Sequence, residues 1–498
     1  MDATLRLRAV DAEGPPVPAR FYVTDASGQS VYPDGSVYVG MRNERLWASE
    51  RHFIADAPTD LRLRPGRVSV LVERGPEFLP QAVEVELQPG ERRRIEIVVP
   101  RWIDMNARGW FSGDIHVHRR PGEMRQLLVA EELNLGTCII TQWRDDPHDS
   151  TQAPSGTDGW LSVIDANHAF SQNDAEVERL GEGPGALVAV GLRTPLTFDC
   201  DRWYPPDATF ADLAHAAGGH VDAEKPVWAT VPVLAALGKL DSVGVVCNHF
   251  ARTGADLDLG PWGARLPPEG RIRTSEGLAR WMGELYSRLL NCGFRLPVTG
   301  GSASGIIPNP VGYTRTYVRL AEEFSYPAWL AALRRGRSFA TNGPMLNVTA
   351  DGRQVGDEID VRSGRTLQVR AEADCPPAMC RLELLLNGEV VADARRAEGA
   401  STVVLEHDLT VREPGWLAAR AFAGAEPNIR FGQTSPIYLS GPGRPSRCAA
   451  DAALLGEWVD ELVGRATDAT ADWPRDRRSP ALAPLREAAA VYRGLSEP

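Results

Sequence analysis

The hydrophobic pattern of this 498-residue chain changes three times along its length, and those changes restrict its fold more than any other feature. Over residues 1–100, short runs alternate apolar and polar side chains between Gly- and Pro-containing turns, which is typical of an antiparallel β-sandwich. Over 101–345, apolar runs alternate with helical patterns. The β-alternation returns over 346–440, and 441–498 carries two helical patterns. We therefore predict four segments, of which the first and third are β-sandwiches.

The second segment reads as an α/β unit. Thr137–Thr141 and Val243–Cys247 are short apolar runs of the kind found in buried strands, and Gly277–Leu290 has the period of an amphipathic helix. Strands that alternate with helices predict a parallel sheet or a barrel. In such folds, the chemistry lies at the carboxyl ends of the strands.

The composition of the chain restricts its binding partners and its cellular compartment. The net charge of −12 argues against a nucleic-acid partner. No apolar run is long enough to span a bilayer, and no basic region followed by an apolar run is visible at the start, so we expect a cytoplasmic protein without membrane contact. The seven cysteines are scattered without a CxxC pair, so most are expected to be buried reduced thiols. Homo-oligomerisation stays open.

The stretch Ser112–His118 reads Ser-Gly-Asp-Ile-His-Val-His and is the strongest chemical signal. On a strand, Asp114, His116 and His118 would point to one face. Two imidazoles and a carboxylate at a strand end predict a metal site, since imidazole is the commonest metal ligand. The alternative is a polar strand end whose histidines bond to their neighbours.

Two further strand ends carry polar residues, Glu224-Lys225 and Asn248-His249. The chain has only two lysines, Lys225 and Lys239, among 54 basic residues. A lysine that survives such a bias toward arginine can be one whose primary amine is needed. For Lys225 we weigh that reading against chance survival. Lys239 reads as a surface residue.

Several motifs resemble those of the PHP superfamily, and in particular its carbaryl-hydrolase-like CehA/McbA branch. The likeness covers residues 101–440 and rests on Trp110–His118, Gly300–Ser304, Gly336–Pro344 and Gln433–Tyr438. It implies a distorted seven-stranded (β/α) barrel with up to three metals, flanked here by the two β-sandwiches.

The resemblance implies His116 and His118 as metal ligands. It also implies Glu176 as a ligand, with Glu178 as the alternative, although Glu176 also fits an ordinary helix-surface carboxylate. The other ligand motifs of the family are altered: Gln142-Trp143 replaces Asp-His, Lys225-Pro226 replaces His-Pro, and Ser302–Gly305 replaces Ser-Asp-Ala-His.

This reduced set predicts one divalent metal, or none, rather than three. Zinc is favoured, with manganese or iron as alternatives. His249 is a further ligand candidate. Lys225, Glu224 and Asp114 are the predicted catalytic residues, with the Lys225 ammonium standing in for a lost cation.

Two functions follow from these residues. The first is a metal-dependent hydrolase that acts on an ester, carbamate, amide or phosphoester of a small-molecule substrate. The second is a catalytically degenerate barrel that serves as a carbohydrate- or partner-binding module. The second predicts a pocket in which no third ligand converges on His116 and His118.

Overall fold

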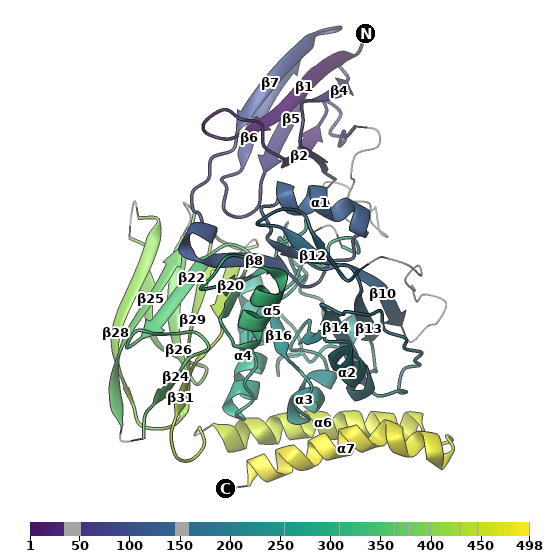
Figure 1. Ribbon diagram of the computed structural model, residues 1–498, viewed down its shortest axis with the longest axis vertical. Helices are drawn as coiled ribbons and strands as arrows, with labels where there is room; N and C mark the ends of the chain where they lie inside the picture. The colour runs from purple at the N-terminus through teal and green to yellow at the C-terminus, as the bar shows by residue number, and fades with distance from the viewer. Residues whose placement is uncertain are drawn as a thin grey trace.

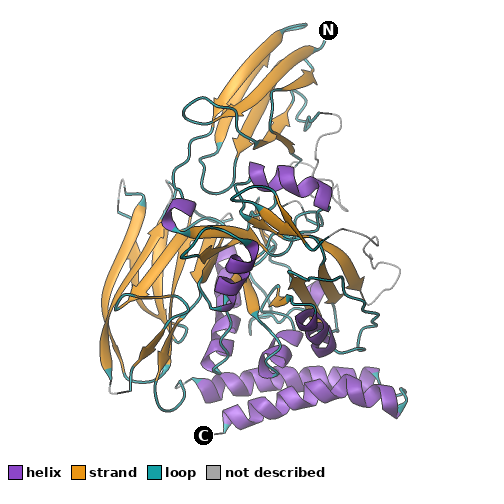
Figure 2. Ribbon diagram, viewed as in Figure 1, coloured by secondary structure: helices purple, strands orange, loops and turns teal. Residues whose placement is uncertain are grey.

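A computed structural model shows a mixed α/β architecture with several sheets (Figures 1 and 2), as predicted at that level. It describes residues 1–33, 51–144, 159–252, 254–307, 309–362, 364–376, 379–397, 400–427, 429–445 and 447–497.

The N-terminal strands form two sheets, at the top of Figure 1. One has the order β4-β1-β7 and the other β3-β2-β5-β6. Side chains alternate between buried and exposed along β1 and β5, as the sequence pattern predicts, and the buried ones share one apolar cluster. The strands are β1 (Ala3–Val10), β2 (Ala19–Thr24), β3 (Phe53–Ala55), β4 (Thr59–Leu63), β5 (Gly66–Glu73), β6 (Gln81–Leu87) and β7 (Arg92–Val98).

The central segment contains a six-stranded sheet with the order β10-β13-β14-β15-β16-β19. Its strands are β10 (Ile139–Arg144), β13 (Asp174–Arg179), β14 (Gly185–Val190), β15 (His220–Ala223), β16 (Ser242–Val246) and β19 (Val298–Gly300). Most neighbours are parallel, but β14 runs antiparallel to both β13 and β15. The expected parallel sheet is therefore mixed. The strands of the described residues do not close into a barrel.

Short helices follow several of these strands. They are α1 (Pro121–Ala130), α2 (Asp207–Ala216), α3 (Thr230–Ala236), α4 (Ser275–Asn291) and α5 (Tyr326–Arg334), with 3-10 turns at Asn106–Arg108 and Gly260–Trp262. Thr274 and Ser325 accept backbone N–H groups at the starts of α4 and α5, which satisfies donors that a helix start leaves unpaired. A small hairpin, β17 (Phe250–Ala251) and β18 (Gly254–Ala255), follows β16.

The largest sheet crosses the boundary predicted at residue 345. It continues from β8 through β20 and β21 to β30, β29, β26 and β27. Its strands are β8 (Trp110–Asp114), β9 (Leu135–Gly136), β11 (Leu161–Val163), β12 (Ala169–Ser171), β20 (Arg315–Arg319), β21 (Ser338–Thr341), β24 (Glu358–Asp360), β26 (Cys380–Leu386), β27 (Glu389–Arg395), β29 (Gly415–Ala423), β30 (Arg430–Thr434) and β31 (Ile437–Ser440). The second and third predicted segments thus share one sheet.

A four-stranded sheet, β23-β22-β25-β28, packs against this large sheet around a shared apolar cluster. Its strands are β22 (Met345–Ala350), β23 (Arg353–Gln354), β25 (Arg365–Asp374) and β28 (Thr402–Val411). Cys375 and Cys380 form a disulfide between the end of β25 and the start of β26, which departs from the expectation for those two thiols. The other five cysteines are free, as expected.

The chain ends in two long helices, α6 (Cys448–Ala469) and α7 (Arg475–Ser496), which pack on each other at the bottom of Figure 1. Two helices were predicted for residues 441–498, as observed. Within the described residues, no helix combines the length and the apolar character needed to cross a bilayer.

Candidate metal centre

The chain leaves β8 at Asp114 and enters an extended loop that carries His116 and His118. The Asp114 carboxylate does not join the two imidazoles. It accepts hydrogen bonds from the backbone N–H groups of His116, Ser302 and Gly312 and from the Ser302 hydroxyl, at 2.5–3.1 Å. Burial raises the pKa of Asp114, and the hydrogen bonds from these donors offset this shift only in part. The contacts of Asp114 are those of a positioning residue, since its carboxylate fixes the loop, and its catalytic role stays a prediction.

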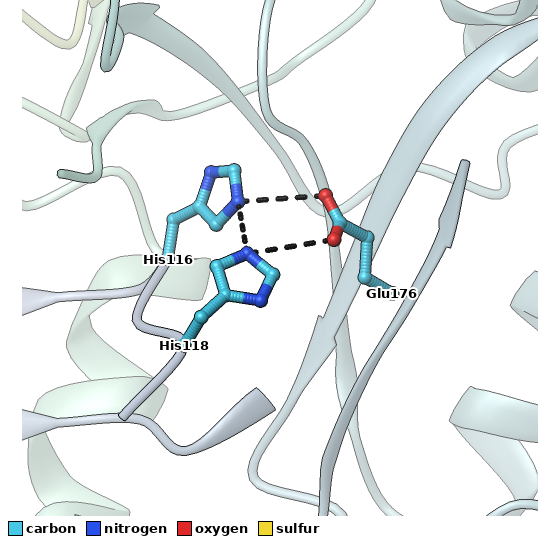
Figure 3. A group of neighbouring side chains, drawn as sticks. All are labelled: His116, His118 and Glu176. Carbon is cyan, nitrogen blue, oxygen red and sulfur yellow. Dashed lines mark hydrogen bonds and ion pairs between the residues drawn. The ribbon is translucent and has the colours of Figure 1, made fainter. Parts of the chain in front are cut away.

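His116, His118 and Glu176 converge on one point (Figure 3). The two Nε2 atoms lie 3.0 Å apart, and the Glu176 oxygens lie 3.4 Å from His116 Nε2 and 3.5 Å from His118 Nε2. All three candidate ligand atoms lie within 4.8 Å of one another. Glu176 is on β13 and is 2% exposed, so it is not the helix-surface carboxylate of the alternative interpretation. Two imidazoles and a carboxylate are a ligand set that suits zinc.

Glu224 contacts the second ring nitrogen of His116, Nδ1. Its Oε2 lies 3.1 Å from His116 Nδ1. Because a carboxylate can only accept, this contact favours the proton on Nδ1 and leaves the Nε2 lone pair for a metal. The second oxygen, Oε1, accepts from Lys225 Nζ at 2.7 Å and from the Trp228 indole at 2.8 Å. Both oxygens of Glu224 are therefore engaged.

The charges of this group depend on one another. Burial raises the pKa of Glu224, but the charges of Lys225 and His116 outweigh it, so the net shift is downward. Burial lowers the pKa of Lys225, but the negative charge of Glu224 raises it by more. The net shift is upward, so the side chain stays an ammonium. Burial likewise lowers the pKa of His116, and Glu224 and Glu176 reverse the direction. The buried lysine is thus paired, which its rarity in the sequence did not show. Lys239 instead pairs with Asp212 at the surface, as expected.

Gln142 is a residue whose role the sequence did not reveal. Its Nε2 donates to Glu176 at 2.7 Å and to Glu178 at 3.2 Å, so one amide orients both carboxylates. Its neighbour Trp143 points away and packs edge-on against Phe198 in the core. The sequence signals were its position after a predicted strand and its place in the motif where the PHP family has Asp-His.

His249 lies in the same cavity but outside the ligand group. Its Nδ1 is 3.4 Å from the carbonyl oxygen of Asp256, which can only accept, so the proton is on Nδ1. Burial and the charge of Lys225 lower the pKa of His249 to about 3. It is therefore a neutral acceptor. The predicted role of His249 as a ligand is not supported, because the hairpin after β16 turns its ring toward Asp256.

The cavity around these side chains has a volume of about 620 Å³. One part is polar, with the candidate ligands His116, His118 and Glu176 and with Lys225 and His249. The rest is apolar and includes Trp228, Trp262 and Ile307. A cavity of this size with a few convergent polar groups is typical of a small-molecule site.

Two glycines let the chain pass close to the histidines. A Cβ at Gly301 would lie 2.5 Å from the Cβ of His116, and one at Gly305 would lie 2.2 Å from the carbonyl oxygen of His118. Gly305 also has a φ of 106°, which disfavours any other residue. The sequence analysis used Gly300–Ser304 only as a family-like motif and did not show this close approach.

Comparisons with protein-family models and with curated proteins return no match to this chain.

Proposed function

We propose that this protein is a metal-dependent hydrolase of the PHP, CehA/McbA-like type, acting on an ester, carbamate, amide or phosphoester of a small molecule. The observation that carries the proposal is the convergence of His116, His118 and Glu176 within 4.8 Å, at the wall of a cavity large enough for a substrate. Three protein ligands leave coordination positions open, as in catalytic zinc sites.

A bound divalent metal would lower the pKa of a water ligand toward neutrality and polarise the substrate oxygen. The protein's own contribution is orientation and charge. Glu224 and Gln142 keep His116 and Glu176 turned toward the metal position. The Lys225 ammonium donates one hydrogen bond to Glu224 and has two more N–H groups with which to stabilise negative charge that develops on the substrate.

Glu224 and His249 differ in how well they are placed to transfer protons. Both oxygens of Glu224, a predicted catalytic residue, are occupied, which argues against proton transfer by its carboxylate. His249 keeps its Nε2 lone pair and lines the cavity, so it can accept a hydrogen bond from the substrate or from a water molecule.

For the fold, we propose that the central strands are an open relative of the distorted (β/α) barrel and that the flanking sheet pairs are β-sandwiches. The bridge between Val117 and Ser304 supports this, because it brings the loop after β8 beside the one after β19. The sheet pairs at either end each enclose an apolar cluster, as sandwiches do.

The binding-module alternative predicts that no third ligand reaches the histidines. Glu176 lies 3.4 and 3.5 Å from them, which favours the enzyme.

The first experiment is metal analysis by inductively coupled plasma mass spectrometry on wild type and the His116→Ala/His118→Ala variant. We expect about one equivalent of metal in wild type and a loss of more than tenfold in the variant. His215→Ala is the matched control, since His215 pairs with Asp241 away from the site. Esters, carbamates and phosphoesters are then screened with that metal. Equal metal content and activity in wild type and the double variant would refute the proposal.

A further inference from the structure

A second cavity, of about 840 Å³, opens between α4, α6 and the loop of residues 263–268. Its floor is apolar and includes Trp281 and Leu455, which are 8% and 2% exposed. Leu454, on the rim, is 43% exposed. We call this cavity the α6 groove. Its size falls within the range of small-molecule sites, and its floor would contact an apolar body of a ligand.

The residues that line the groove carry a net positive charge, opposite in sign to the net charge of the whole chain. The groove residues include three arginines and one glutamate, in a protein with a net charge of −12. Arg288 is already paired with Asp451 and Glu284, and Arg265 is paired with Glu461 at 2.7 Å. These two cations are therefore compensated.

Arg465 differs from the other two. Its Nη1 donates to the carbonyl oxygen of Glu182 at 3.1 Å. In the part of the chain that the structure describes, no carboxylate lies within ion-pair distance of its guanidinium. A guanidinium is suited to binding one carboxylate through two parallel hydrogen bonds.

We propose that the α6 groove binds an amphipathic organic anion, with an apolar chain on the Trp281 and Leu455 floor and a single carboxylate on Arg465. Among the described residues Arg465 is the groove cation with no carboxylate at ion-pair distance, although Glu461 and Glu182 lie near enough to act on its charge, and the apolar floor fits a hydrocarbon chain. The site is separate from the metal centre, although both use the same loop: Trp262 lines the metal-centre cavity, and the next residue, Gly263, lines the groove.

Isothermal titration with decanoate, below its micelle concentration, tests the proposal on the full chain. We expect one saturable site, no saturation with acetate, and at least tenfold weaker binding of the uncharged 1-decanol. Arg465→Gln should weaken decanoate about tenfold, and Leu454→Glu should abolish binding by placing a like charge on the rim. Leu213→Glu is the matched control, since Leu213 is a 38% exposed leucine on α2, and it should bind as wild type does.

Absence of saturable decanoate binding, or equal binding by wild type, Arg465→Gln and Leu454→Glu, would overturn the proposal. So would sedimentation that shows a dimer in wild type and a monomer in Leu454→Glu, because that result would assign the groove to a second copy of the chain. The His116→Ala/His118→Ala variant should bind decanoate normally, so the result does not depend on the proposed hydrolase activity.

Discussion

At the scale of single residues, Glu224 decides how His116 is used. It is the one carboxylate at ion-pair distance from Nδ1 among the described residues, and it is itself fixed by Lys225 and Trp228. Carboxylates that hold the far nitrogen of a metal-binding imidazole set its tautomer and raise its basicity. If His116, His118 and Glu176 hold a metal as proposed, a large share of its affinity should depend on Glu224, which is not one of the three candidate ligands.

Replacing Glu224 by Gln should weaken metal binding about 10- to 100-fold. The amide keeps the shape of the carboxylate but loses its charge, and it can turn an N–H toward His116. Chelator competition on the purified protein measures the affinity. Trp228→Phe is the matched control, since it removes one donor to Glu224 and leaves the carboxylate, and it should change the affinity less than threefold. Equal affinity of Glu224→Gln and wild type would rule out this role.

The two histidines could be predicted from the sequence because their signal was local, since they stand two residues apart. Glu176 was named only through the family resemblance, with Glu178 as the alternative. The roles of Asp114 and Gln142 could not be predicted, because they depend on chain segments that meet only in the fold: Ser302 lies 188 residues from Asp114, and Glu176 lies 34 residues from Gln142.

At the scale of elements, the metal centre depends on how closely the loop after β19 passes the loop after β8. Backbone hydrogen bonds join them, from Ala303 N–H to the carbonyl of His116 and from His118 N–H to the carbonyl of Ser304, both at 2.7 Å. Gly301 makes the approach feasible because it has no Cβ. The position of His116 is therefore set by a residue on another strand end.

Gly301→Ala should reduce metal content at least tenfold without altering a ligand. The new Cβ would lie 2.5 Å from the Cβ of His116 and 3.0 Å from its backbone nitrogen, so the loop must shift. Gly464→Ala on α6 is the control, since its Cβ meets nothing within 4 Å. Metal analysis together with circular dichroism separates a local shift from unfolding. A fully loaded, folded Gly301→Ala protein would contradict the argument.

Asp241 ties α2 to the neighbouring strands. Its Oδ2 accepts from the His215 ring at 2.9 Å and from the Val221 N–H at 2.8 Å. Burial raises the pKa of Asp241, but these donors and the charge of His220 lower it to about 2. Because the folded pKa lies below the unfolded value, the stabilisation is present above about pH 4 and is lost as the pH falls toward 2.

Asp241→Asn should therefore lower the melting temperature by about 2 °C at pH 7, which corresponds to about 1 kcal/mol after discounting for partial exposure. The difference from wild type should shrink as the pH is lowered to 3. Calorimetric scans across this range give the result. Asp212→Asn, in an exposed pair with Lys239, should change the melting temperature little. A difference that stays constant with pH would exclude the ionised carboxylate as its cause.

The alternation of strands and helices over residues 101–345 was predictable, but the direction of the strand β14 was not. The apolar run Gly185–Val190 is buried throughout, and such a run looks the same whether its neighbours are parallel or antiparallel. The direction follows from the short connection that joins β13 to β14, which leaves no room for a crossover helix.

At the scale of the whole molecule, a buried ionic network fastens the N-terminal sheets to the central segment. Arg20 on β2 pairs with Glu73 on β5 at 2.6 Å and with Glu131 at the end of α1. Arg252, after β17, contacts both oxygens of Glu73 at 2.9 and 3.0 Å. The composition change near residue 100 predicted separate segments, but it could not show this contact, whose partners are up to 179 residues apart.

Arg20→Ala should destabilise this junction by about 3–5 kcal/mol, because it leaves the buried carboxylate of Glu131 without its ion-pair partner, whereas Glu73 keeps Arg252. Arg20 is 4% exposed and Glu131 is 2% exposed, so water cannot easily solvate the Glu131 carboxylate once the arginine is removed. We expect the calorimetric transition to move to lower temperature or to split in two, with the N-terminal sheets released first. Limited proteolysis should then cut near residue 100 faster than in wild type.

Arg67→Ala tests whether this effect belongs to the network or to any arginine of the same sheets. Arg67 pairs with Glu84 at the surface, with 67% and 57% of the two side chains exposed, and such pairs contribute about 1 kcal/mol or less. Its scan and its proteolysis rate should therefore match wild type. If Arg20→Ala also matched wild type, the sheets would be held to the central segment by apolar contacts, and the ionic network would be incidental to the assembly of the molecule.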